Sequence, residues 1–94
     1  MMLKPMHVMT EAETRDFVKS HVKYDKDLGG YCWSSYIITA DTKNSDIVSM
    51  TKGLRGLADD DYDAIINFQA AKEVLLKMRD LLKQRELEKE VMAA

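Results

Sequence analysis

The chain has 94 residues, of which 46% are hydrophobic and 32% are charged, and its net charge is −2. This length accommodates one domain but not two, so we expect residues 1–94 to form a single small domain. The composition excludes disorder as the default, and the small charge gives no general attraction to nucleic acid or to an anionic membrane.

The single cysteine, Cys32, cannot form a disulfide within the chain. The first residues, Met1 to Pro5, lack the apolar core of a signal peptide. No apolar run approaches the roughly 18 residues that a membrane span needs. We therefore expect a cytoplasmic protein with no membrane segment.

Thr10 and Glu13 have the spacing of a capping box and predict a helix that begins at Thr10. The buried edge of this helix should comprise Phe17, Val18, His21 and Val22. We expect the helix to stop by Tyr24. Beyond it, Gly29 and Gly30 can supply the positive φ angles of a chain reversal.

Residues 31–40 are rich in aromatic and β-branched side chains and predict a strand. Strand alternation places Tyr31 and Trp33 on one face and Tyr36 on the other. Only one face can cover a helix. The second is a candidate surface for binding a partner.

This strand needs a neighbour in a small antiparallel sheet. Residues 6–9 and residues 47–51 are the two candidates, and the second would make a hairpin. However, Ile47, Met50 and Leu54 also fit helical spacing. The sequence does not decide whether residues 47–51 are strand or helix.

From Asp59 to the end, the chain reads as one long amphipathic helix without Gly or Pro. The acidic residues 59–61 would lie in its first turn, where anions are favoured and where one of them would be the N-cap. A core stripe recurs at steps of four and three residues and consists of Ala64, Phe68, Ala71, Leu75, Met78 and Leu82.

A second stripe of Leu76, Leu87 and Val91 points in a different direction from the core stripe. Residues 84–94 would then be a projecting helix end. Its apolar side chains could be covered by a twofold-related copy, so we expect a homodimer, or by another protein.

The segment from Gly53 to Gly56 has the GxxG spacing with which some RNA-binding domains approach phosphates, and Lys52 and Arg55 add positive charge. The pattern is weak, and residues 59–61 would repel a phosphate nearby. We favour a helix-ending turn here. A nucleic-acid loop with Lys52 and Arg55 is the alternative.

The acidic residues also begin like a calcium-binding EF-hand loop. Ala64 and Ala70 stand where that loop needs Gly and Glu, which excludes this route to calcium.

Cys32 has no spacing to His7 or His21 that indicates a catalytic pair or a zinc site. We therefore expect no catalytic residues, no metal and no cofactor.

Together these patterns predict an α+β fold with an N-terminal helix, a small antiparallel sheet or hairpin, and a long C-terminal helix. An all-α bundle is the alternative. The expected function is a non-enzymatic protein-interaction module, acting as an adaptor, inhibitor or regulatory subunit. The expected partner-binding residues, on a helix face and an aromatic strand face, are Leu76, Leu87, Val91, Tyr31, Trp33 and Tyr36. The alternative is a nucleic-acid-associated regulator that uses Lys52, Arg55 and basic residues of the last helix, although we expect no tight binding of nucleic acid.

Overall fold

The computed structural model describes residues 6–93, with side chains described for residues 6–89. The helices are α1 (Glu11–His21), α2 (Asn44–Tyr62) and α3 (Phe68–Ala93). The strands are β1 (His7–Val8), β2 (Lys23–Asp25), β3 (Gly30–Trp33), β4 (Tyr36–Ile38) and β5 (Ala64–Ile65). The fold is therefore α+β, as predicted, and the all-α alternative is wrong.

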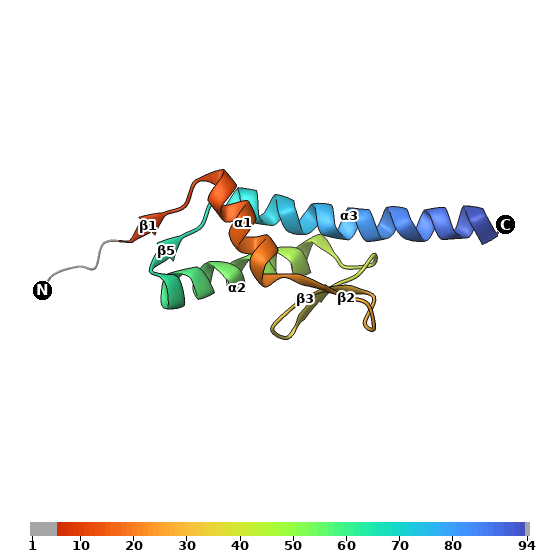
Figure 1. The fold of residues 1–94 in the computed structure, drawn as a ribbon, viewed down its shortest axis with the longest axis horizontal. Coiled ribbons are helices and arrows are strands. Elements are labelled where there is room, and N and C mark those ends of the chain that lie inside the picture. Colours follow the sequence, from red (N-terminus) through yellow and green to blue (C-terminus); the bar gives the residue numbers. More distant parts are fainter. Residues whose placement is uncertain (1–5, 94) are drawn as a thin grey trace, which may run out of the picture.

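Helix α3 lies parallel to the long axis of the molecule, and α1 and α2 both pack against it (Figure 1). The antiparallel sheet β2–β3–β4 lies beside the helices, and β1 and β5 form a separate parallel pair. The last turns of α3 extend past all the other elements (Figure 1). The molecule is consequently elongated, with extents of 65 × 23 × 21 Å.

Helix α1 begins at the predicted capping box. The Thr10 hydroxyl accepts the Glu13 N–H at 3.1 Å, and the Glu13 carboxylate accepts the Thr10 N–H at 3.1 Å. Glu13 also lies 2.8 Å from the His7 ring in β1. The hydrogen bond from the Thr10 backbone and then that from His7 lower the pKa of the Glu13 carboxyl below its ordinary value. This contribution to stability is therefore complete above the unfolded-state pKa and is lost as the pH falls through the folded-state pKa.

The two glycines after α1 serve the sheet in different ways. Gly29 adopts a φ of 69° in the connection between β2 and β3, as the predicted reversal requires. Gly30 begins β3, where a Cβ atom would collide with the carbonyl oxygen of Ile38 in β4. The first glycine is needed for its φ angle and the second for its lack of a side chain.

The prediction of one strand over residues 31–40 is wrong, because this segment is a hairpin. Ser34 and Ser35 connect β3 to β4, and Ser34 has a φ of 54°. Trp33 and Tyr36 are register partners and lie on the same face of the sheet. The predicted alternation, which put Tyr36 on the other face, is wrong for the same reason: a two-residue turn brings Tyr36 opposite Trp33.

Neither predicted neighbour supplies the partner of this hairpin. Strand β2 does, with Tyr24 opposite Tyr31. Residues 6–9 contain β1, which pairs with β5, and residues 47–51 lie in α2. The helical alternative for residues 47–51 is correct, and it buries Ile47, Met50 and Leu54.

The prediction that the long helix begins at Asp59 is also wrong. Residues 59–61 lie near the C-terminal end of α2, and Asp63 ends that helix with a left-handed φ of 47°. Negative charge is unfavourable at a helix C-terminus. Residues 59–61 therefore do not cap the start of a helix, and α2 ends at Asp63, whose N–H donates to the Ala58 carbonyl oxygen.

The break before α3 is held by contacts to α1 and β1. His7 in β1 is the register partner of Ala64. The Asn67 N–H donates to the Thr14 hydroxyl of α1 at 3.0 Å, and the Asn67 side chain accepts the Ala70 N–H at 3.1 Å. Asn67, rather than one of the aspartates, therefore caps the first turn of α3.

Most of the predicted core stripe is buried. Its buried members on α3 are Ala71, Leu75, Met78 and Leu82. Ala64 is buried too, but it lies in β5 rather than on the helix. Phe68 is only half-buried, and the Arg55 guanidinium lies 5.4 Å from its ring centroid. The hydrophobic core is thus the surface that α1, α2 and the sheet share with the first half of α3.

We predict that Leu75→Ala lowers the free energy of unfolding by about 2–5 kcal/mol, because Leu75 is fully buried and its loss leaves a cavity. Leu87→Ala is the matched control on the same helix, since Leu87 is 57% exposed. We expect it to cost less than about 0.5 kcal/mol. Urea unfolding measures both, and equal losses would show that the face of α3 has been misassigned.

Candidate functional site

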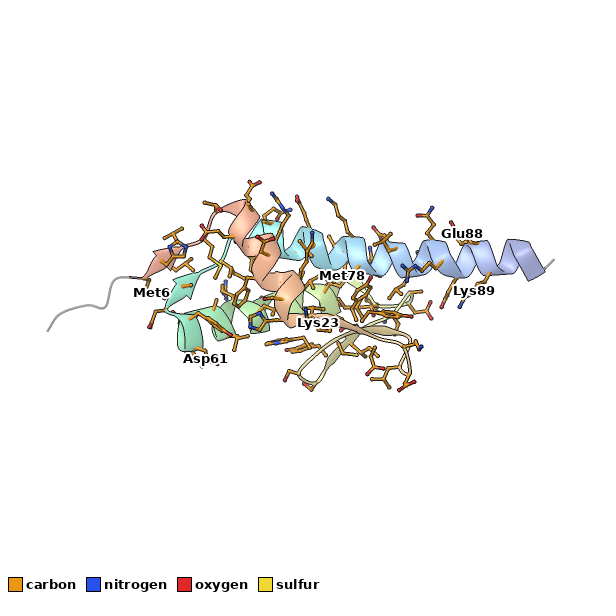
Figure 2. All side chains as sticks on the ribbon, in the orientation of Figure 1. Met6, Lys23, Asp61, Met78, Glu88 and Lys89 are labelled. Carbon is orange, nitrogen blue, oxygen red and sulfur yellow. The ribbon has the colours of Figure 1, made fainter. Side chains whose placement is uncertain are left out.

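A groove of about 410 Å³ lies between α1, α3 and β3 and is the candidate site; we call it the α1–α3 groove. Its apolar floor consists of Val22, Tyr31, Val74, Met78 and Leu81. Its basic rim consists of Arg15, Lys19 and Lys77, all exposed. Met78, labelled in Figure 2, lies on α3 beside the end of α1. The groove therefore combines an apolar floor with positive charge.

Helical spacing brings these side chains to one place. On α1, Arg15, Lys19 and Val22 follow one another at steps of four and three residues, which keeps them on one side of the helix. On α3, Val74 and Leu81 are separated by two turns and share a side in the same way. Helices α1 and α3 pack against each other (Figure 1), and the groove lies between these two faces.

The second stripe is only partly available to a partner. Leu76 is half-buried and packs against the core of its own chain. Leu87 is 57% exposed on the part of α3 that extends past the other elements. The side chain of Val91 lies outside the described residues. Partner binding by this stripe stays a prediction, and Leu87 is its one described member that is exposed.

The three predicted aromatic residues share one face of the sheet and are half-buried. Trp33 and Tyr36 stack with ring centroids 5.8 Å apart, and the Trp33 ring lies against Gly53 of α2. Tyr31 instead lines the α1–α3 groove. Trp33 and Tyr36 therefore join the sheet to α2, whereas Tyr31 reaches the candidate site. Their role in binding a partner stays a prediction.

Lys52 and Arg55 do not lie in a loop. Both belong to α2, and the GxxG segment of residues 53–56 is uninterrupted helix, so the prediction of a helix-ending turn is wrong. The two cations line a shallow surface hollow together with Asp59, whose charge opposes theirs. The backbone geometry on which a phosphate-binding loop would depend is absent from this segment.

The candidate thiol and imidazoles lie on different elements with separate contacts. Cys32 is half-buried in β3, with its Sγ atom 3.8 Å from the Gly30 carbonyl oxygen. His7 contacts Glu13, and His21 lies 3.0 Å from the Tyr62 hydroxyl. Over the described part of the chain, no three His, Cys, Asp or Glu side chains are grouped so that they could hold a metal ion.

Sequence reasoning missed the α1–α3 groove. The helical spacing of Arg15, Lys19 and Val22 was the available signal, because long basic side chains can lie along apolar surface while their charged ends stay in water. This face of α1 meets Val74 and Leu81 only because of the way the two helices pack. The sequence pattern of either helix alone does not predict that contact.

Comparison with models of known families, with curated proteins and with solved structures finds no match to this chain. Every helix within the described residues is too short or too polar to cross a lipid bilayer.

We predict different effects of an alanine substitution at two glycines of α2. Gly56→Ala should stabilise the protein by about 0.5–1 kcal/mol, because its Cβ would meet open space and Ala favours the helix. Gly53→Ala should be destabilising relative to Gly56→Ala, because its Cβ would lie 2.9 Å from the Trp33 ring. Thermal unfolding of both variants measures the difference. Equal stabilisation would contradict the packing of Trp33 against α2.

Proposed function

We propose that this chain is a non-enzymatic protein-interaction module, an adaptor, inhibitor or regulatory subunit, that binds another protein through the α1–α3 groove. The observation that carries the proposal is the apolar lining of this groove, in which Leu81 is exposed and Val22 and Val74 are buried. Leu81 is 49% exposed there, next to the buried Met78. Apolar surface open to water in a concave site is typical of places where another molecule docks.

The chemistry of the groove supports binding rather than catalysis. Its lining offers ammonium and guanidinium groups, one phenol and apolar side chains. Its described lining includes no carboxylate, imidazole, thiol or aliphatic hydroxyl that could pair with Lys19, Lys77 or Tyr31 as a base or nucleophile. These side chains can attract and seat a partner by charge and by shape.

The test is affinity capture from an extract of the native host, with protein and nucleic acid both identified. We expect the wild-type chain to enrich a protein that the Leu81→Asp variant fails to enrich, because a buried carboxylate would oppose docking. Leu28→Asp is the matched control, since Leu28 is 61% exposed and does not line the groove. Enrichment of nucleic acid alone, or no difference between wild type and Leu81→Asp, would contradict the proposal.

We extend the proposal to self-association through the end of α3. Leu87 is exposed, and the end of α3 extends past every other described element in Figure 1. Twofold pairing of two such ends would bury both leucines, and twofold dimers are the commonest assemblies of small soluble proteins. This contact uses a different part of α3 from the groove, so a dimer would still present two grooves to partners.

Sedimentation equilibrium over micromolar concentrations measures self-association. It reports mass independently of shape, which matters for a molecule 65 Å long and 21 Å thick. We expect a wild-type dimer that Leu87→Glu converts to a folded monomer, because the new charges would repel one another across the dyad. Leu28→Glu, the same change at another exposed leucine, should remain dimeric. A monomeric wild-type chain would remove the homodimer from the proposal.

A further inference from the structure

The charged side chains described as lining the α1–α3 groove are all basic. Arg15, Lys19 and Lys77 line it, and no acidic residue of the described part of the chain does. Arg15 has a partner, since its guanidinium lies 3.7 Å from the Glu11 carboxylate. Lys19 and Lys77 form no ion pair with any described residue. Two unpaired ammonium groups beside an apolar floor favour a ligand that brings its own carboxylates.

The floor of the groove is elongated. Val74, Met78 and Leu81 follow one another along α3 and span about 10 Å at the helical rise of 1.5 Å per residue. The exposed Leu81 extends this apolar strip toward the part of α3 that projects from the molecule. Two turns of an amphipathic helix have this length and present apolar side chains at matching intervals.

We infer that the α1–α3 groove binds an acidic amphipathic helix of another protein. The apolar side chains of that helix cover the strip from Val74 to Leu81, and its carboxylates pair with Lys19 on one side and Lys77 on the other. This inference rests on the proposed function and names the chemistry of the partner. It also predicts that raised salt weakens the complex, because the rim charges are exposed to solvent.

The test is an NMR titration of the full ¹⁵N-labelled chain with two synthetic peptides of equal length. Both carry leucine at helical i, i+3, i+4 and i+7 positions; the first has glutamate and the second lysine at the positions between. We expect the acidic peptide to shift the amide resonances of Val22, Val74 and Leu81. The basic peptide should bind about tenfold more weakly or not at all.

Three charge-reversal variants then assign the carboxylate contacts. Lys19→Glu and Lys77→Glu should each weaken the acidic peptide by about tenfold. Lys52→Glu makes the same change in net charge on α2, outside the groove, and should leave the affinity within about twofold of wild type. Equal effects of Lys52→Glu and Lys19→Glu would mean that only net charge matters, and would overturn the inference.

Other outcomes overturn it as well. Equal binding of both peptides would overturn the inference, and so would the absence of any shift of the groove resonances with the acidic peptide. A shift caused by monomeric laurate alone would make the groove a site for a small amphiphile. Dissociation of a wild-type dimer by Leu81→Asp would mean that a second copy fills the groove. If the acidic peptide fails while a captured protein still depends on Leu81, the proposed function stands and only this inference falls.

Discussion

Burial of one face of α3 is the interaction on which the rest of the structure depends. Leu75, at the centre of this face, is fully buried, and α1 and α2 both pack against the same helix. Arg79 of α3 also donates to the Thr42 carbonyl and to the Asn44 side chain, where α2 begins. Because both shorter helices are positioned by α3, the groove between α1 and α3 is a direct consequence of core packing.

Features set by neighbouring residues could be predicted from the sequence, and those set by distant contacts could not. The capping box of Thr10 and Glu13 is complete within four residues, and its prediction is confirmed. The class of fold follows from composition and periodicity and is confirmed, and the predicted buried face of α3 is confirmed from Ala71 to Leu82 but not at Ala64 or Phe68. The predicted start of the long helix at Asp59 was wrong. The break before α3 depends on the hydrogen bond from Asn67 to Thr14, a residue of α1 that no local pattern connects to it.

In the sheet, too, the composition predicted the type of element but not how its residues pair. Its aromatic and β-branched composition correctly indicated strand, but Ser34 is neither Gly nor Asn, so its left-handed conformation left no sign in the sequence. One unrecognised turn then reversed the predicted face of Tyr36. The candidate site was even harder to predict from the sequence, because the groove brings together residues of α1, α3 and β3. Of the residues predicted to bind a partner, Tyr31 is the one that lines the groove.

The pairing of β1 with β5 has a consequence for how the molecule opens. It joins His7 to Ala64 across most of the chain, yet each strand has only two residues, and Val8 and Ile65 are both exposed. A pairing of two-residue strands with exposed side chains buries little apolar surface that would resist local opening. This end of the molecule therefore belongs to the least protected part of the native state, and its amides should exchange with solvent through local opening while the core around Leu75 stays closed.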